Sequence, residues 1–479
     1  MENKNNAITA RDVDFAKWYT DVCKKAKLMD YGSVKGFINY LPYGYAIWEE
    51  IQSYLDKKFK SIGVSNVYLP TVIPSSLFNK EKEHIEGFAP ECLVCTIGGG
   101  NKLADPLIVR PTSEILFSDL FKKLVSSYRD FPILFNQWCS VVRWEKTTRP
   151  FLRGSEFLWQ EGHCLFETEL EAENNAQWIL DNAYDACGKE LLAIPFLKGK
   201  KTEHEKFAGA VNTYAIEALM HDGKALQSGT SHYLGTGFAE AFGISYQARD
   251  NSLKAPHQTS WGASTRLIGA VIMVHGDDNG LVLPPYVAPI QVVIVPVRQK
   301  EAGVLEASKK LYEELKSQGI RVKLDADDSR TPGWKFAEYE MKGVPLRVEI
   351  GPRDLAKGEA VLTKRVNGEK KVLPLSEIAS LAPALLKEIH QNMYDKALAF
   401  LNSHIHDAKD VNELNAILDK GGYGKMAFCG KKECEDAIKT LTNGGTTRVI
   451  AEELPSDTSL RCPVCGEKAK IIAYFARAY

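Results

Sequence analysis

The spacing of apolar residues near the N-terminus predicts two amphipathic helices followed by a strand. In residues 10–28 and again in residues 45–63, apolar side chains recur every three or four positions, which places them on one helical face. Gly63 is expected to end the second helix, and residues 64–74 read as a strand that carries Pro70. The apolar positions are Phe15, Trp18, Val22 and Ala26 in the first helix, and Trp48, Ile51, Leu55 and Phe59 in the second.

Strand-like runs dominate the next two hundred or so positions of the chain. They cover residues 107–114, 133–145, 156–166 and 270–284, although the apolar run that opens at Arg266 fits a helix as well as a strand. The second and third of these runs flank a charged loop that contains proline and glycine, so we expect them to pair in an antiparallel sheet.

From residue 291 the pattern alternates between strands and helices. Strand-like residues 291–297, 320–327 and 344–350 are separated by helical patterns, which predicts a small α/β domain with parallel strand pairs. The turn at Asn367-Gly368 predicts a hairpin at one edge of that sheet. A further small unit is expected from about residue 400.

Composition and charge are those of a globular protein with several domains. The chain has 479 residues, 44% of them hydrophobic and 25% charged, with a net charge of −1. This length exceeds what one hydrophobic core normally serves. No apolar run is long enough to span a bilayer, and the first twelve residues lack the apolar core of a signal peptide. We therefore expect a cytoplasmic protein that makes no membrane contact and keeps its cysteines reduced.

Four of the ten cysteines form two close pairs near the C-terminus. Cys429 and Cys434 are spaced C-x4-C, and Cys462 and Cys465 are spaced C-x2-C. Two loops that each offer two thiolates can surround one structural Zn²⁺ and leave no open coordination position for catalysis. Unliganded thiols and disulfides are the alternatives. Cys92 and Cys95 have no second pair near them in sequence and are expected to be an ordinary loop feature.

Arginines and aromatic residues gather around the charged loop. No phosphate-binding glycine loop, dinucleotide fingerprint or serine elbow is present, so a nucleotide would have to be held by side chains. Strand periodicity predicts Arg143 and Glu145 on one face, while Arg153 and Phe157 begin the return strand. A guanidinium can bind phosphate and an aromatic ring can stack on a base. Taken singly, each of these arginines is more typical of a surface salt bridge, and the same holds for Arg266.

These residues together resemble the three motifs of class II aminoacyl-tRNA synthetases. The matching features are a strand with Pro70, R-x-E at Arg143 and Glu145 followed by R-x-x-x-F at Arg153 and Phe157, and G-x-x-x-R at Gly262 and Arg266. The stretches RPTSE, FLWQEGH and TSHYLGTGFAEAFGI, and the final tyrosine, are similar to prolyl-tRNA synthetases of the archaeal and eukaryotic kind. The resemblance covers nearly the whole chain from about residue 10.

The resemblance implies a fold of three domains and a ligase activity. Residues 1–286 would form an α+β catalytic domain on an antiparallel sheet, residues 287–398 an α/β anticodon-binding domain, and residues 399–479 a small zinc-binding α/β domain. The expected reaction is ATP-dependent activation of L-proline, with Mg²⁺, and transfer of the prolyl group to tRNA(Pro). A homodimer that packs around Pro70 is also implied, as is the absence of the large editing insertion of bacterial-type enzymes.

The resemblance also assigns roles to individual residues. Arg143 and Arg266 would be the catalytic pair, with Arg143 bridging the α-phosphate and the proline carboxylate. The ATP-binding residues would be Arg143, Glu145, Arg153, Phe157, Gln227, Thr230 and Arg266. The proline-binding residues would be Thr112, Glu114, Arg143, Trp159, Glu161, Phe207, His232 and Ser264. The anticodon contacts would be Arg330, Glu340 and Arg347.

Other interpretations of these residues, without a role in binding or catalysis, stay open at this stage. Trp159 and Phe207 can be core residues and His232 a satisfied interior histidine. The paired aspartates of HGDDNG, residues 275–280, could indicate a metal but are expected to form a structural turn. A threonyl or seryl enzyme would need a different amino-acid pocket, and a non-catalytic relative would be expected to lack Arg143, Glu145 or Arg266.

Overall fold

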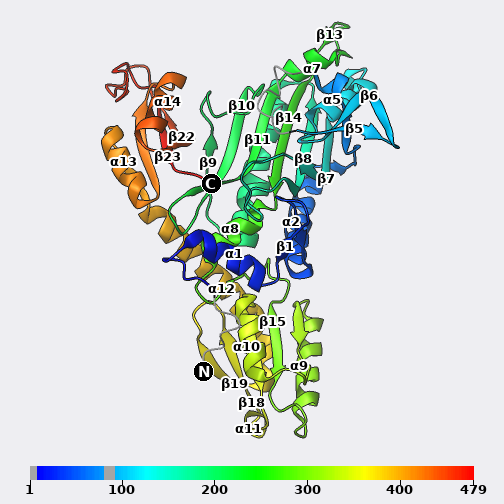
Figure 1. Cartoon of the computed structure of the whole chain (residues 1–479), viewed down its shortest axis with the longest axis vertical. Helices are drawn as coiled ribbons and strands as arrows, with labels where there is room; N and C mark the ends of the chain where they lie inside the picture. The colour runs from blue at the N-terminus through cyan, green and yellow to red at the C-terminus, as the bar shows by residue number, and fades with distance from the viewer. Residues whose placement is uncertain (1–7, 80–91) are drawn as a thin grey trace.

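The computed structural model describes residues 8–79 and 92–479. Residues 1–7, which make up much of the segment searched for a signal peptide, lie outside the described residues. Figure 1 shows three bodies: a large one built on an antiparallel sheet, a lower one built on β15–β19, and a smaller one built on β20–β23 that lies beside β9 and β10. Helix α12 (Leu375–Ser403) links the second body to the third.

The large body is organised by a seven-stranded sheet. Its strands are antiparallel except for the parallel pair at one edge, β3 with β7. In spatial order they are β3 (Ser65–Asn66), β7 (Ile133–Val142), β8 (Glu156–Phe166), β14 (His257–Ser264), β11 (Ala225–Gly235), β10 (Asn212–Leu219) and β9 (Leu197–Lys200). The expected antiparallel pairing of residues 133–145 with 156–166 is confirmed, with Val142 opposite Glu156.

Smaller sheets and helices surround the main sheet. The sheets are β4 (Val72–Pro74), β6 (Asn101–Val109) and β5 (Leu93–Gly98); β1 (Met29–Tyr31) and β2 (Ile38–Tyr40); and β12 (Tyr246–Gln247) and β13 (Leu253–Lys254). The helices are α1 (Phe15–Lys25), α2 (Pro42–Ser61), α3 (Ser75–Phe78), α5 (Glu114–Leu124), α6 (Glu169–Trp178), α7 (Gly237–Phe242) and α8 (Arg266–His275), with further helical turns at Tyr128–Asp130, Ile179–Asp185 and Gly188–Leu192.

The two predicted N-terminal helices form, and local chemistry sets their ends. The Asp14 side chain accepts a hydrogen bond from the Lys17 amide and so caps the start of α1. Pro42 occupies the first turn of α2, where its missing N–H has no cost. Gly63 has φ +86° just past the end of α2, as expected of a terminating glycine. On the inner side, the Phe59 ring lies 4.6 Å from that of Trp261 on β14.

Three strand predictions are wrong in detail. Of the run predicted over residues 107–114, only the part up to Val109 is strand, in β6, and Glu114 begins helix α5. Residues 64–74 form two short strands, β3 and β4, separated by an irregular link at Pro70, because proline cannot donate a ladder hydrogen bond. Buried Arg110 holds this link by donating to the Leu69 and Pro70 carbonyls at 2.7 and 3.2 Å. The strand predicted over residues 270–284 is absent, because its first six residues belong to helix α8. This is the helical alternative for the run that opens at Arg266, and the helix is buried on almost every side, so periodicity could not distinguish it from a strand.

The second body has the predicted alternation of strands and helices. Strand β15 pairs in parallel with both β16 and β17, and the hairpin of β18 and β19 turns at Gly368, where φ is +68°. The elements are β15 (Val292–Pro296), α9 (Val304–Ser317), β16 (Val322–Leu324), α10 (Pro332–Met341), β17 (Leu346–Ile350), α11 (Pro352–Leu355), β18 (Glu359–Lys364) and β19 (Lys370–Pro374).

The third body is a four-stranded sheet with two helices. Its elements are β20 (Ile405–Asp407), α13 (Val411–Lys420), β21 (Tyr423–Phe428), α14 (Lys432–Leu441), β22 (Thr446–Glu453) and β23 (Ile471–Ala476). Beyond β23 the chain returns to the large body, where the Tyr479 hydroxyl donates to Asp222 at 2.5 Å. Within residues 8–79 and 92–479, no helix combines the length and the apolar character needed to cross a membrane.

Candidate active site

One face of the main sheet carries rows of functional side chains because neighbouring strands align them. Successive side chains on a strand alternate between faces, so Phe157, Trp159, Glu161 and His163 of β8 share one face. The antiparallel register extends these rows across the sheet. One row runs Thr213, His232, Ser260 and His163, and the next runs Thr230, Gly262, Glu161 and Gln137.

A cavity of about 290 Å³ lies over these rows. Twelve residues expected to bind ATP or proline line it, namely Thr112, Glu114, Arg143, Phe157, Trp159, Glu161, Phe207, Gln227, Thr230, His232, Ser264 and Arg266. Glu145 and Arg153 do not line it. They pair with each other at 3.2 Å in the loop between β7 and β8, where Arg153 is exposed.

Arg143 and Arg266 enter the cavity from two different elements. Arg143 directly follows β7, and its Nε donates to the Pro111 carbonyl at 3.0 Å. The expectation that Arg143 and Glu145 share a strand face is therefore wrong, because β7 ends one residue earlier. Arg266 begins α8 and donates to the Leu152 and Gln227 carbonyls at 2.9 and 3.1 Å.

The electrostatics of this arginine group favour an anion. Burial, together with the positive charges of Arg153 and Arg143, lowers the pKa of Arg266 to about 10. Arg266 stays charged at neutral pH, so the cations repel one another while the cavity lacks an anion. A polyphosphate would remove that repulsion.

Aromatic rings form a wall beside Arg143. The Arg143 guanidinium carbon lies 5.4 Å from the Phe157 ring centroid and 5.3 Å from that of Trp159. The two rings meet edge to face at 5.8 Å. Phe157 thus offers a flat apolar surface next to a cation, which suits stacking of a base near its phosphates.

A second wall carries carboxylates in fixed positions. Thr112 donates to Glu114 at 2.5 Å, and both are almost fully buried. Glu161 accepts from Ser113, Gln137 and His163 at 2.5–3.1 Å. Burial acts to raise the pKa of Glu161, but these hydrogen bonds outweigh it and the pKa lies below its ordinary value. Glu161 is therefore ionised, and the wall can receive a cationic amine.

Phe207 and His232 close the opposite side. Their rings lie 4.8 Å apart, and Thr213 ties them together through its hydroxyl, which lies 3.0 Å from both the Phe207 amide nitrogen and His232 Nδ1. Burial lowers the pKa of His232 to about 3, with the charges of His163 and Lys201 acting in the same direction. A neutral imidazole beside an aromatic ring makes this side apolar.

Sequence reasoning missed several residues that line the cavity. They are His163, Lys201, Glu205, Thr213, Ser228, Gly229, Ser260, Trp261, Gly262 and Ala263. Strand alternation would have found His163 from its neighbours on β8, but the cross-strand partners Thr213 and Ser260 need the register. The buried Ser260 hydroxyl has no hydrogen-bond partner among the described residues, so a bound polar group can satisfy it.

Comparisons with known proteins agree with this arrangement. Residues 99–275 match the family model described as tRNA synthetase class II core domain (G, H, P, S and T), residues 291–385 match Anticodon binding domain, and residues 411–479 match Prolyl-tRNA synthetase, C-terminal. The proline–tRNA ligases of Lachnospira eligens and Lachnoclostridium phytofermentans are each 54% identical to this chain over 476 residues, which is 99% of this chain and 98% of each relative. That of Clostridium botulinum is 53% identical over 475 residues, 98% of both chains.

The chain belongs to the proline–tRNA ligase family. Its fold class is the one expected: a class II core, an anticodon-binding domain and the family's C-terminal domain, in that order. These relatives come from bacteria, although the motifs resemble the archaeal and eukaryotic kind. The boundaries at residues 286/287 and 398/399 stay a prediction.

The C-terminal domain of this ligase holds the four paired cysteines in one cluster. The ligand atoms of Cys429, Cys434, Cys462 and Cys465 all lie within 4.8 Å of one another, and the sulfurs of Cys429 and Cys465 are 3.7 Å apart. Four bonds of ~2.3 Å to one zinc would separate the sulfurs by ~3.8 Å. The donor set and its spacing therefore fit Zn²⁺. Cys92 and Cys95 are not part of a comparable group within the described residues.

The anticodon-binding domain has a cavity of its own, of about 250 Å³. Glu340 and Arg347 line it, and Arg330 does not. Arg347 packs its guanidinium 4.2 Å from the Phe336 ring centroid and pairs with Glu349 at 2.9 Å.

The HGDDNG turn of the ligase ties its domains together. Both carboxylate oxygens of Asp277 accept from Arg365 of the anticodon-binding domain, at 2.6 and 2.7 Å, and the Asp277 carbonyl accepts from Trp18. With its oxygens committed to an arginine, Asp277 has the structural role that the sequence indicates.

Proposed function

We propose that the chain activates L-proline with ATP and transfers the prolyl group to the 3′-terminal adenosine of tRNA(Pro). The main support for this proposal is a single cavity whose lining combines cationic, aromatic and acidic side chains. Arg143 and Arg266 suit phosphates, Phe157 suits an adenine ring, and Thr112, Glu114, Phe207 and His232 suit a small cationic ring.

In the first step an oxygen of the proline carboxylate attacks the α-phosphorus of ATP. The bond from that phosphorus to the pyrophosphate oxygen breaks, leaving prolyl-adenylate and pyrophosphate. Two anions must approach each other, so the barrier depends on cations placed where negative charge builds up. Arg143 bridges the carboxylate and the α-phosphate, and Arg266 holds the γ-phosphate. Their hydrogen bonds to backbone carbonyls fix both groups before the substrates arrive.

The rest of the ATP site is assigned by the same reasoning. Phe157 stacks on the adenine, while Gln227 and Thr230 of β11 contact the nucleotide from the sheet. Glu145 and Arg153 act from the loop between β7 and β8. Mg²⁺ would offset the remaining phosphate charge, and it usually binds through substrate phosphates and one or two carboxylates, of which Glu145 is a suitable one.

Proline is selected by charge and shape together. Its secondary amine has two N–H donors, which Thr112, Glu114 and Glu161 accept. Its apolar ring lies against Trp159, Phe207 and neutral His232, and Ser264 borders the pocket. A neutral His232 suits this role because a cation there would repel the proline amine.

In the second step a ribose hydroxyl of the terminal adenosine attacks the carbonyl carbon of the adenylate. The carbonyl carbon to phosphate oxygen bond breaks and AMP leaves. Glu340 and Arg347 read the anticodon from the second cavity, because a carboxylate and a guanidinium match the edges of unstacked guanines. Arg330 is exposed beside Trp334 and contributes from the margin.

The deciding experiment is ATP–pyrophosphate exchange with each of the twenty amino acids in turn. Proline should give the fastest exchange by a wide margin. Exchange that depends on another amino acid, or on none, would contradict the assignment.

We also propose that the cysteine cluster binds one structural Zn²⁺. Its support is the fit of four thiols to a tetrahedron. Elemental analysis should find one zinc per chain, and Cys462→Ser should release it and lower the melting temperature of the C-terminal domain, since binding there is coupled to folding. A stable, zinc-free wild-type protein would contradict this.

A homodimer is proposed around the segment that contains Pro70. The β4–β6–β5 sheet and the link before it expose large apolar side chains, including Tyr68 at 68% and Ile97 at 66%, which a two-fold partner would cover. Light scattering should show a dimer at micromolar concentration. An active monomer would rule it out.

Finally, we propose that the chain has no editing site of its own. Residues between β8 and α8 build strands β9 to β14 and helices α6 and α7, and three of these strands, β10, β11 and β14, contribute to the lining of the proposed synthetic pocket. Alanine lacks apolar contacts worth about 1–3 kcal/mol per methylene, so it should be activated slowly. Ala-tRNA(Pro) should not be hydrolysed by the chain, and its rapid deacylation would reveal a missed site.

A further inference from the structure

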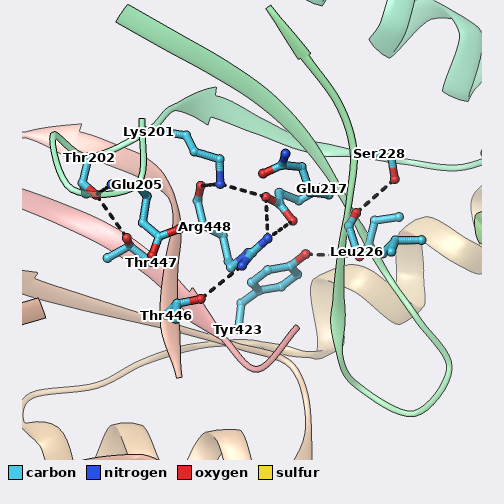
Figure 2. Close-up of polar contacts among 12 residues, drawn as sticks. Lys201, Thr202, Glu205, Glu217, Leu226, Ser228, Tyr423, Thr446, Thr447 and Arg448 are labelled. Carbon is cyan, nitrogen blue, oxygen red and sulfur yellow. Dashed lines mark hydrogen bonds and ion pairs between the residues drawn. The ribbon is translucent and has the colours of Figure 1, made fainter. Parts of the chain in front are cut away.

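A cluster of buried charges joins the catalytic sheet to the C-terminal domain (Figure 2). Glu217 of β10 is fully buried, and Lys201 and Arg448 are 3% and 7% exposed. Arg448, on β22, donates from Nη2 to both carboxylate oxygens of Glu217 at 3.0 Å. Lys201 Nζ lies 3.3 Å from the same carboxylate and donates to the Arg448 carbonyl at 3.1 Å. One carboxylate therefore holds two cations that come from different domains.

The members of this cluster depend on one another. Removing one partner from a buried ion pair leaves an uncompensated charge, which is strongly destabilising. Burial lowers the pKa of Lys201; the Glu217 carboxylate opposes this effect and the charge of Arg448 adds to it. Without the Arg448 side chain, Glu217 would keep Lys201 as its only direct cationic partner among the described residues. The backbone carbonyl of residue 448, to which Lys201 donates, would no longer be held by the ion pair between Arg448 and Glu217.

The cluster lies directly behind the wall of the active-site cavity. Lys201 lines that cavity. Glu217 is opposite Gln227 in the β10–β11 register, and the Gln227 carbonyl accepts from Arg266. Gln227 is held by the strand pairing, whereas Lys201 is held by the Glu217 side chain, so a shift of the Glu217 carboxylate is expected to displace Lys201 and to leave Gln227 in place.

The segment that follows Lys201 is anchored to the C-terminal domain a second time. The Thr202 hydroxyl lies 3.1 Å from a Glu435 carboxylate oxygen and 3.2 Å from the Thr447 hydroxyl. His204 lies 3.0 Å from Asp436. Residues 201, 202 and 204 thus contact the C-terminal domain, while Phe207 reaches the cavity three positions later.

We propose that Arg448 is a positioning residue for proline activation. It holds Glu217, Glu217 holds Lys201, and together they fix the base of the 201–207 segment so that Phe207 closes the proline side of the cavity. The C-terminal domain thereby takes part in amino-acid binding although it contributes no side chain to the cavity lining. This inference rests on the proposed function, because it assigns a role in the first half-reaction.

The alternative is that the cluster only holds two domains together. The two readings differ in which kinetic constant changes. Loss of domain adhesion would lower the melting temperature and the active fraction, with substrate affinities unchanged. A misplaced 201–207 segment is expected to weaken proline binding selectively, because Phe207 packs against His232, which is assigned to the proline pocket.

The test compares Arg448→Met, Arg448→Lys, Glu217→Gln and the double variant with Arg477→Met in the full-length chain. Arg477 is the matched control, because among the described residues its side chain bonds only to residues 415–442 of its own domain. We expect Arg448→Met to raise the KM for proline by on the order of tenfold, with the KM for ATP changed by less than about threefold. Arg448→Lys should recover part of the loss, and Arg477→Met should leave both KM values unchanged.

Two further measurements complete the test. Because Arg448 acts through Glu217, the double variant should lose little more than either single variant, whereas independent effects would multiply. Amide hydrogen exchange should become faster in residues 201–207 of Arg448→Met while residues 411–420 stay protected. This second readout needs no catalysis, so it tests the positioning even if wild-type protein fails to activate proline and the proposed function falls.

An unchanged KM for proline together with unchanged exchange in residues 201–207 would overturn the proposal. So would an equal rise in KM from Arg477→Met, or multiplicative effects of the two cluster variants. Should Arg448→Met fail to fold, Arg448→Lys and Glu217→Gln carry the same comparison.

Discussion

The cavity of the catalytic domain and that of the anticodon-binding domain are both lined by arginines, but the groups that hold these arginines differ. Arg266 in the first donates to two backbone carbonyls and forms no ion pair among the described residues. Arg347 in the second is paired with Glu349, and its neighbour Lys364 is paired with Glu369 and Glu388. Carbonyls fix a guanidinium without neutralising it, whereas carboxylates cancel its charge.

This difference indicates what each cavity can bind. In the catalytic cavity the positive charge of Arg266 is not cancelled by an ion pair among the described residues, which is what binding of a triphosphate requires. The second cavity offers donors and acceptors with little net charge, which suits the edges of bases better than phosphates. The same residue type therefore serves two kinds of recognition, depending on what holds it.

The largest effect on the catalytic cavity is expected from removing the Arg143 side chain. Arg143→Ala should abolish pyrophosphate exchange, because a lost transition-state contact of this kind costs about 3 kcal/mol or more. Circular dichroism and melting temperature should stay near the wild-type values, since the residue lies outside the sheet. Wild-type exchange rates from this variant would contradict the role given to Arg143.

Arg347→Ala should give the opposite pattern. Pyrophosphate exchange needs no tRNA and should be unchanged, whereas kcat/KM for tRNA(Pro) should fall by about 1–3 kcal/mol in equivalent free energy. The loss should be smaller for tRNA variants with altered anticodon bases, which identifies a base contact. Loss of pyrophosphate exchange in Arg347→Ala would mean that the two cavities are not independent.

The elements of the fold could be predicted from the sequence more fully than the site could. Helices α1 and α2 follow from periodicity, and β8 matches the predicted run because its flanking turn residues are explicit. Helix α8 was ambiguous because it is apolar on nearly every side. The break at Pro70 depends on Arg110, whose hydrogen bonds to this link come from about 40 positions later in the chain.

The site could be predicted only where resemblance supplied the residues. Arg143 and Arg266 were named from motifs, and the structure brings both to one cavity. Ser260 and Thr213 were missed because a residue enters this site through its row in the sheet, and strand register cannot be read from one strand. The cluster of Lys201, Glu217 and Arg448 was also missed, since its members are separated by up to 247 positions.

Acidification should destabilise the catalytic domain through His275 of α8, which lies outside the lining of the active-site cavity. Burial lowers the pKa of His275 in the catalytic domain from its ordinary value of 6.5 to about 4, so below pH 6.5 the unfolded chain binds a proton that the folded one does not. The free energy of unfolding therefore decreases as the pH is lowered from 6.5 to about 4, by about 1.4 kcal/mol per pH unit for this residue.

His275→Gln should retain the hydrogen bond to the Leu192 carbonyl and remove that proton uptake. Between pH 7 and about pH 5.5, the wild-type protein should lose ~1.4 kcal/mol more stability than the variant loses. Chemical denaturation at the two pH values checks this. Equal acid loss in both proteins would contradict the cause given for the shift.

The smallest expected effect belongs to Arg330, and it sharpens the contrast within the anticodon-binding domain. Arg330 is exposed, lies outside the cavity and packs 4.8 Å from the Trp334 ring centroid, so it can meet the tRNA backbone without displacing a carboxylate. A phosphate contact adds affinity that does not depend on sequence and weakens with salt. Arg330→Ala should therefore weaken all tRNAs alike and lower the slope of log affinity against log salt by about 1. Arg347→Ala should alter anticodon preference and leave the slope nearly unchanged, because its charge is already paired. Binding titrations at several salt concentrations with tRNA(Pro) and an anticodon variant measure both quantities. An anticodon-dependent loss of affinity in Arg330→Ala would instead indicate that Arg330 contacts an anticodon base.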